Sequence, residues 1–199
     1  MNLRNAILVG LIGLSFTFAG LTATLKSVEV TRLQGRYQLI ADTYLAAAPA
    51  AISQVLLDFD NDRYSQISEI YKESTYLAPD SDGTPLVYTR VEGCLMVFCR
   101  SMRRVERLEI VTPNLIRSTV LPERSDFKYA SSEWTLEPEA GGTRVTYRME
   151  MEPDFWLPPF VGPWFLRRTL LNGGVSAVER IEELAQQVDR DAPLRAESR

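Results

Sequence analysis

The sequence predicts an α+β domain, in which a curved antiparallel sheet of about seven strands is accompanied by two short helices and a long C-terminal helix. Two observations lead to this fold class. Between residues 69 and 152, apolar and polar side chains alternate with the period of a strand, and short turns separate the runs. After residue 162, apolar side chains recur at steps of three and four residues, as on one face of a helix. No helical pattern lies between the strands within residues 69–152, so these consecutive strands should pair antiparallel.

The first elements can be placed from residue 37 onward. Residues 38–45 form the first expected strand, and Pro49 opens a helix over residues 50–59, because a missing N–H is harmless in the first helical turn. A second short helix or turn follows through Tyr64 and Ile67.

Six further strands are expected at residues 69–78, 86–93, 98–111, 115–121, 127–138 and 143–152. The four residues EAGG, 139–142, are typical of a hairpin turn between the last two strands. The alternation breaks between Met102 and Val105, which predicts a β-bulge there.

The remaining segments set the domain boundaries. Residues 24–36 are polar and are assigned to a linker, and residues 37–188 form the domain. Its last helix runs from about 162 to 188, and the charged residues 189–199 are predicted to be a flexible tail. Gly173 and Gly174 interrupt the helix. They indicate either a kink with close packing on the sheet or clearance for a ligand beneath it.

Residues 1–23 have the pattern of an export segment. Arg4 precedes residues 6–23, which contain no charged side chain. This length is on the border between a signal peptide and a short membrane anchor; a buried N-terminal helix is the third alternative. The sequence therefore predicts an exported, periplasmic protein that is either soluble or tethered to the inner membrane.

Composition excludes several classes of function. The chain has no histidine and two cysteines, so His-based catalytic triads, His-based metal sites and zinc sites are not expected. The net charge is −4, which disfavours nucleic acid as a partner because phosphate binding needs a basic face. The sequence predicts neither a metal nor an organic cofactor.

Cys94 and Cys99 can form a disulfide only if the chain turns within residues 95–98, because on a straight strand they would point to opposite faces. Export to an oxidising compartment favours the bond, and two free thiols are the alternative. The apolar residues 95–98 would then form a tip, which could gate a ligand site, contact a membrane or pack under the long helix.

Three stretches resemble a known superfamily: the Ala- and Pro-rich residues 46–51, the segment 58–64, DFDNDRY, and the tract 132–152, SEWTLEPEAGGTRVTYRMEME. Together with the element order over residues 37–188, they resemble the START-like, or SRPBCC, superfamily with its helix-grip fold. The similarity is to polyketide cyclase/dehydrase-like and coenzyme Q-binding-like members. The resemblance implies a cavity between the sheet and the C-terminal helix. It also implies a lipid, quinone, sterol or polyketide as ligand, and some members are enzymes.

Aromatic and methionine side chains are the candidate ligand contacts of such a cavity. Methionine adapts to varied ligand shapes, and Trp or Tyr offers a polar group on an apolar wall. The candidates are Tyr88, Met102, Trp134, Tyr147, Met149, Trp164 and Val175. Each could instead belong to the plain hydrophobic core. Arg90 or Arg104 could also point into the cavity and meet a polar head group.

The sequence favours the binding, and by extension the transport or presentation, of a hydrophobic small molecule such as a lipid, quinone or polyketide-like compound. A cyclase- or dehydratase-type enzyme is the first alternative, with Glu133, Tyr88, Tyr147 or Arg90 as the acid or base. An accessory protein tethered to the membrane is the second. Membrane contact would be made by residues 6–23 or 95–98.

Overall fold

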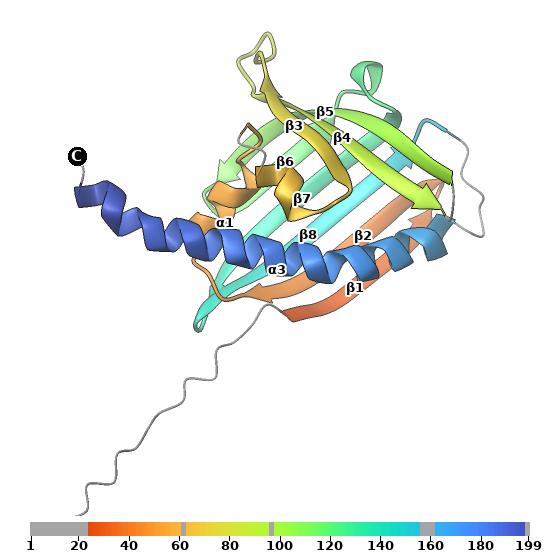
Figure 1. Cartoon of the computed structure of the whole chain (residues 1–199). Coiled ribbons are helices and arrows are strands. Elements are labelled where there is room, and N and C mark those ends of the chain that lie inside the picture. Colours follow the sequence, from red (N-terminus) through yellow and green to blue (C-terminus); the bar gives the residue numbers. More distant parts are fainter. Residues whose placement is uncertain (1–23, 61–62, 96–97, 156–161, 198–199) are drawn as a thin grey trace, which may run out of the picture.

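The computed structural model describes residues 24–60, 63–95, 98–155 and 162–197. Within them, eight strands form one sheet, and three helices lie beside it (Figure 1). The elements are β1 (Thr24–Leu33), β2 (Arg36–Leu45), α1 (Pro49–Leu56), α2 (Arg63–Ile67), β3 (Tyr71–Leu77), β4 (Leu86–Leu95), β5 (Phe98–Thr112), β6 (Leu115–Val120), the 3-10 turn η1 (Pro122–Arg124), β7 (Phe127–Glu139), β8 (Gly142–Pro153) and α3 (Gly162–Glu197). The predicted fold class is confirmed.

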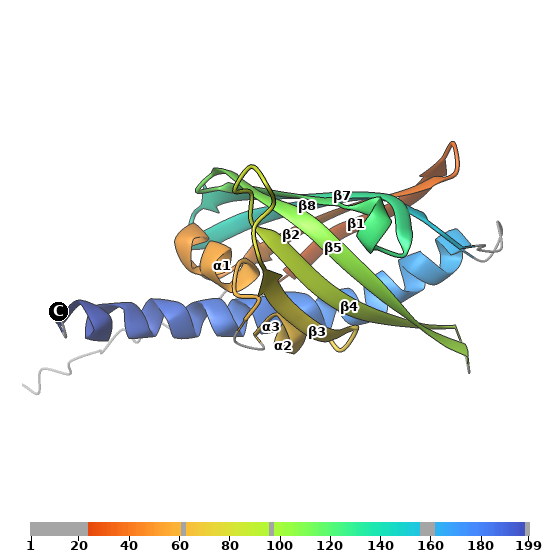
Figure 2. The same cartoon turned by 90° about the horizontal axis from the view of Figure 1, so that it is seen from above.

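The sheet is open and entirely antiparallel, with the order β1-β2-β8-β7-β6-β5-β4-β3. Strand β8 returns to pair with β2, while α1 and α2 carry the chain from β2 to the opposite edge at β3. The sheet bends around α3, which crosses its concave side (Figures 1 and 2). All candidate contacts that face this concave side are therefore brought under one helix.

The polar segment 24–36, predicted as a linker, contains β1 and the turn to β2. Val28 and Val30 are half-buried, while Ser27, Glu29 and Thr31 between and beside them are exposed. This alternation is typical of an edge strand with one solvent-exposed face. In a short, mostly polar segment it is hard to recognise from the sequence.

The predicted tail 189–199 is also ordered over most of its length, because α3 continues to Glu197. The Asp189 carboxylate accepts a hydrogen bond from the Ala48 N–H at 3.2 Å, which joins the end of the helix to the start of α1. Residues 1–23, predicted as the export segment, lie outside the described residues. Among the residues that are described, no helix is both long enough and apolar enough to cross a membrane.

The predicted bulge between Met102 and Val105 is wrong. Strand β5 pairs with β4 in unbroken register from Leu86 opposite Arg107 to Leu95 opposite Phe98. The alternation only seemed to break because Arg104, a residue expected on the solvated face, lies on the buried one.

Two apolar clusters occupy the concave face. The larger one joins α1, the second half of α3 and the sheet, through Leu45, Ile52, Val55, Leu136 and Ala185, each at most 1% exposed. The smaller one contains Val120, Phe127 and Ala130, with Met102 and Met151 packed against it.

Hydrogen bonds connect the β7–β8 turn to the segment between β2 and α1. The buried Thr143 hydroxyl donates to the Ala47 carbonyl at 2.7 Å, and the Tyr44 hydroxyl donates to the Ala140 carbonyl at 3.1 Å. Gly142 lies so close to β2 that a Cβ atom there would come within 2.2 Å of the Leu45 carbonyl oxygen. The backbone itself therefore needs glycine at this position.

We expect Gly142→Ala to lower the free energy of unfolding by about 2 kcal/mol or more, because the atom that the new Cβ would meet belongs to the backbone of β2 and not to a flexible side chain. Gly93→Ala is the control: its added Cβ would meet only the Met102 side chain at 3.6 Å, an ordinary contact. Chemical denaturation of both variants checks this, and equal stability of the two would contradict the close approach.

Candidate functional site

A small polar cavity lies on the concave face beneath α2 and the connection that leads to it. Its volume is about 20 Å³, which is room for about one water molecule. It is lined by Leu56, Phe59, Tyr64, Tyr71, Val87, Thr89, Arg104, Glu106, Leu108, Ile116, Ser118, Ser132, Trp134 and Tyr147. Every strand from β3 to β8 contributes at least one of these side chains, so the site is made by the whole curved sheet.

An ion pair occupies the middle of this lining. Arg104 and Glu106 stand two residues apart on β5, hence on the same face, and their side chains are 11% and 6% exposed. The Arg104 guanidinium donates to Glu106 Oε1 at 2.6 Å. Burial by itself lowers the pKa of Arg104, but the adjacent Glu106 carboxylate and the nearby tyrosines outweigh it and raise that pKa. Arg104 therefore remains charged at any physiological pH.

A chain of hydroxyl groups extends from this pair across the sheet. The Ser118 hydroxyl donates to Glu106 Oε1 at 2.7 Å, and its oxygen lies 2.8 Å from the hydroxyl of Ser132, its register partner on β7. Tyr147 on β8 is close enough for the Ser132 hydroxyl to favour its phenolate, which acts to lower the pKa of Tyr147. One connected network of hydrogen bonds therefore links β5, β6 and β7, and Tyr147 of β8 lines the same cavity.

Two further tyrosines close the opposite side of the cavity. Tyr71 lies beside Tyr64 of α2, and the nearby Arg104 guanidinium acts to lower the pKa of Tyr71. Burial raises the pKa of Tyr64, Tyr71 and Tyr147, because the phenolate would have to exist away from water. All three hydroxyls thus remain protonated at neutral pH and can both donate and accept hydrogen bonds.

Two polar atoms in the lining have no partner. They are Thr89 Oγ1, on a residue that is 1% exposed, and Arg104 Nε. Thr89 and Arg104 face each other as register partners on β4 and β5. An unpaired buried polar group costs about 1–3 kcal/mol, so these two atoms are places where a bound molecule would gain hydrogen bonds.

Aromatic rings form the apolar walls of the cavity. The rings of Trp134 and Tyr147 lie 4.1 Å apart between centroids, and those of Phe59 and Tyr64 are stacked at 4.3 Å. Tyr71 meets Tyr64 edge-on at 4.9 Å. The cavity therefore combines a polar floor on the sheet with a cover of aromatic rings.

The candidate contacts predicted from the sequence separate in the structure. Trp134 and Tyr147 line the cavity side by side. Met149 is half-buried on the same face of β8, outside the lining, and Met102 packs against the smaller apolar cluster. Whether any of these side chains contacts a ligand stays a prediction.

Other candidates lie away from the cavity. Tyr88 and Arg90 are on the opposite face of β4, where Arg90 forms an ion pair with Glu73 at 2.7 Å. Of the two arginines proposed for the cavity, the structure therefore selects Arg104. Trp164 is 57% exposed near the start of α3, and the side chain of Val175 lies outside the described residues.

Sequence reasoning missed Tyr64, Tyr71, Thr89, Glu106 and Ser118. One signal could have found the ion pair: Arg104 and Glu106 stand in phase with Met102 and Leu108 on β5, so a straight strand places all four on one face. The expected acid Glu133 is instead a surface group, paired with Arg117 at 2.7 Å.

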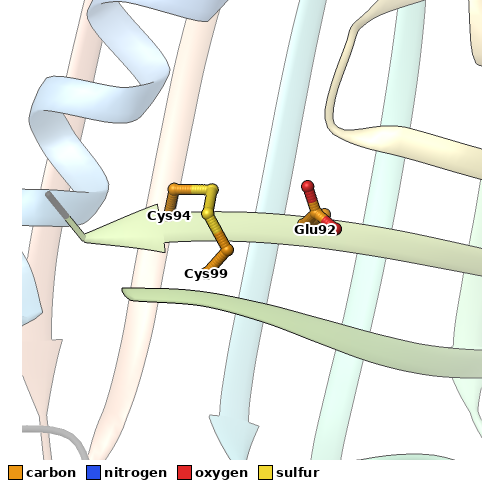
Figure 3. A group of neighbouring side chains, drawn as sticks. All are labelled: Glu92, Cys94 and Cys99. Atoms are coloured by element: carbon orange, nitrogen blue, oxygen red, sulfur yellow. A yellow bond between two sulfur atoms is a disulfide. The ribbon is translucent and has the colours of Figure 1, made fainter. Parts of the chain in front are cut away.

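The predicted disulfide between Cys94 and Cys99 is present, and it joins register partners at the ends of β4 and β5 (Figure 3). Glu92 lies beside it, with ligand atoms of all three residues within 4.8 Å of one another. Metal coordination requires thiolates, and these sulfur atoms are bonded to each other. The trio is therefore a structural cross-link in this form. The predicted apolar tip at 95–98 lies outside the side chains that the structure describes.

We expect Arg104→Met to lower the free energy of unfolding by about 3 kcal/mol, because Glu106 would be left buried without its partner. The double variant Arg104→Met, Glu106→Leu should recover most of this loss, since no charge then remains in the cavity. Urea denaturation of the two variants checks both steps. A double variant as unstable as the single one would show that the ion pair is not the interaction at stake.

Comparison with known proteins agrees with this architecture. Residues 39–186 match the family model described as polyketide cyclase / dehydrase and lipid transport. No functionally curated protein matches the sequence.

Three solved structures illustrate the fold. A START superfamily protein from Mycobacterium smegmatis superposes with a TM-score of 0.59 at 18% identity, covering 76% of this chain and 98% of that one. A STAR-related lipid transfer protein from Xanthomonas axonopodis superposes with a TM-score of 0.59 at 18% identity, covering 82% of this chain and 98% of that one. The Zhui aromatase/cyclase from a Streptomyces species superposes with a TM-score of 0.58 at 15% identity, covering 79% of this chain and 98% of that one. Because the family model spans well over half of the chain, the protein belongs to the polyketide cyclase / dehydrase and lipid transport family.

Proposed function

We propose that the protein binds a hydrophobic small molecule that carries a neutral polar group, such as a hydroxyl or carbonyl, and that this group is held in the cavity by Arg104 and Thr89. The observation that carries the proposal is the pair of unpartnered buried atoms, Arg104 Nε and Thr89 Oγ1. The family description, and the lipid transfer protein among the similar structures, support a hydrophobic ligand.

The charge balance of the cavity favours a neutral group over an anion. Arg104 is already neutralised by Glu106 at 2.6 Å, and the hydroxyl of Ser118 completes the coordination of that carboxylate. A ligand carboxylate would lose its hydration and meet Glu106 at close range, whereas a hydroxyl or carbonyl would meet free donors and acceptors.

The apolar body of the ligand needs more room than the cavity offers, since about 20 Å³ holds about one water. Methionines lie next to the polar floor: Met102 and Met151 border the smaller apolar cluster, and Met149 is half-buried between them and Tyr147. Their flexible side chains can move aside at little cost. The body of the ligand would therefore lie along the concave face toward the start of α3, with Met102 and Met149 as contacts.

The predicted location fits this role. Export by residues 1–23 would place the domain in the periplasm, either soluble or tethered to the inner membrane. Contact with lipid through residues 6–23 or 95–98 would bring the cavity near a source of apolar molecules. Transport or presentation of the ligand is the function that such a location supports.

We expect Thr89→Val to stabilise the ligand-free protein by about 1 kcal/mol and to weaken ligand binding about tenfold. The variant keeps the shape of the side chain but removes a buried hydroxyl that no group of the described protein satisfies. Urea denaturation measures the first effect, and fluorescence titration with Nile red, a neutral carbonyl-bearing dye, measures the second.

Thr143→Val is the matched control, because that buried hydroxyl already donates to the Ala47 carbonyl at 2.7 Å. It should lower stability and leave dye binding unchanged. Hexadecanol should also displace the dye more effectively than palmitate does. Equal competition by the alcohol and the carboxylate, or an unaltered dye affinity in Thr89→Val, would contradict the proposed role of the polar floor.

A second function is favoured by the meeting of a carboxylate and tyrosine hydroxyls in one cavity. In a dehydration, Glu106 would accept the proton from the carbon next to a substrate carbonyl. Tyr147, which lines the same cavity and remains protonated, would supply the proton with which the leaving hydroxyl departs as water. The aromatase/cyclase among the similar structures supports this alternative.

If the protein is such an enzyme, Glu106→Gln should slow the loss of water from a β-hydroxyketone by about a hundredfold or more. Glu133→Gln should have no effect, because Glu133 lies outside the cavity lining and pairs with surface arginines. Mass spectrometry of the incubated substrate checks both variants. Unchanged substrate with the native protein would leave binding as the function of the cavity.

A further inference from the structure

Three exposed arginines share an arrangement that the cavity does not explain. Each lies over an aromatic ring, measured from the guanidinium carbon to the ring centroid: Arg32 over Tyr37 at 5.2 Å, Arg100 over Phe155 at 4.0 Å and Arg168 over Trp164 at 5.5 Å. Among the residues that the structure describes, no carboxylate pairs with any of the three. Stacking orders a guanidinium and leaves its N–H edges free for an oxyanion.

The three arginines lie at one end of the molecule. Arg32 precedes the β1–β2 turn, Arg100 lies at the start of β5 and Arg168 lies near the start of α3. Tyr37, beneath Arg32, pairs with Met151 near the end of β8, and Phe155, beneath Arg100, follows the same strand. In both views, the β1–β2 turn, the β4–β5 end and the start of α3 lie at the end opposite the C-terminus (Figures 1 and 2).

The local charge of this end differs from that of the whole chain. Its neighbouring carboxylates are already paired: Glu150 and Glu152 with Arg36, Asp126 with Arg103 and Asp154 with Lys128. The three stacked arginines therefore leave an excess of positive charge on a chain whose net charge is −4.

The same end exposes apolar surface. Leu33, at the β1–β2 turn, is 59% exposed, and Trp164 is 57% exposed. A tryptophan beside arginine is a combination suited to the boundary between lipid head groups and acyl chains. Phosphate of a nucleic acid, or a carboxylate of an acidic protein, would account for the arginines but leave Leu33 and Trp164 without a role.

We propose that this basic end, defined by Arg32, Leu33, Arg100, Trp164 and Arg168, binds the surface of a membrane that contains anionic phospholipid. The arginines contact lipid phosphates, and Leu33 and Trp164 enter the head-group layer. This surface goes beyond the proposed ligand cavity, because none of its residues lines that cavity.

The start of β1 determines where a retained export segment would attach the domain to a membrane. Strand β1 has 10 residues, a length of about 33 Å, and it starts at Thr24, directly after the predicted export segment. A retained segment would attach the domain at the end of β1 remote from Leu33. The acceptor membrane must therefore be supplied separately from any membrane that holds residues 6–23.

The experiment uses the full chain, free or held in phosphatidylcholine vesicles, mixed with acceptor vesicles that contain brominated phosphatidylglycerol. Bromine on the lipid quenches a tryptophan that enters the head-group layer, and subtraction of the Trp164→Phe signal isolates Trp164. We expect quenching with brominated phosphatidylglycerol, little with brominated phosphatidylcholine, and loss of quenching at high salt.

Each of Arg32→Gln, Arg100→Gln and Arg168→Gln should weaken partitioning onto the anionic vesicles about fivefold, and the triple variant about a hundredfold. The matched control is Arg117→Gln, Arg148→Gln, Arg180→Gln, which removes the same charge from arginines that pair with Glu133 and Glu183 elsewhere. It should retain most of the partitioning. Equal losses in the two triple variants would overturn the proposal, and so would tight binding of soluble polyglutamate without any quenching, which would indicate an acidic protein partner.

The two proposals fail separately. Nile red binding depends on the cavity and should be unchanged in the triple variant of the basic end. Thr89→Val should partition onto vesicles like the native protein. A protein that binds dye but not anionic vesicles would overturn only the membrane surface.

Discussion

A single helix has to cover the concave face of an eight-stranded sheet, and this constraint organises the rest of the molecule. Helix α3 packs against α1 and, through Ile181 and Ala185, completes the larger apolar cluster at one end. Its end is joined to the start of α1 through Asp189 and Ala48. One helix cannot fill the whole curve of the sheet. The middle strands therefore receive their cover from Phe59 and Tyr64, on the connection to α2 and on α2 itself.

The polar residues are gathered on the part of the face that lies beneath Phe59 and Tyr64. A buried ion pair is generally no source of stability, because desolvation of both charges offsets their attraction. Arg104 and Glu106 persist there because the Ser118 hydroxyl of β6, itself hydrogen-bonded to Ser132 of β7, also donates to the carboxylate. The network is incomplete only at Thr89 Oγ1 and Arg104 Nε. These two atoms are the ones to which the proposed ligand would bind.

Membership of the family is compatible with both binding and catalysis, because the family includes cyclases and dehydrases as well as lipid transport. The features that separate these functions are local. A charge-balanced polar surface with free donors suits a neutral polar group, whereas a carboxylate and a tyrosine that line the same cavity suit proton transfer. Both use the same residues, so a binding protein and an enzyme could differ here only in which molecule enters. The basic end lies apart from this floor, and its arginines are ordered by aromatic rings rather than by carboxylates.

Local pattern in the sequence determined the secondary structure, because period-two and helical spacing are properties of consecutive residues. It predicted the antiparallel sheet, the start of α1 at Pro49 and the long C-terminal helix. It also predicted the disulfide, since Cys94 and Cys99 flank a short apolar turn. It misassigned β1, because an edge strand with one wet face is mostly polar and resembles a linker.

Only the tertiary structure decided which residues form the site. Tyr64, Thr89, Glu106 and Ser132 come from elements far apart in the sequence, and nothing in their local surroundings marks them as neighbours. Arg104 shows the reason most clearly. An arginine on a strand is expected to face water, and only the partner carboxylate and the hydroxyls of adjacent strands make its burial tolerable. Alternation along β5 placed it on one of two faces, but the curvature of the sheet and the cover by α2 determined that this face was the inside.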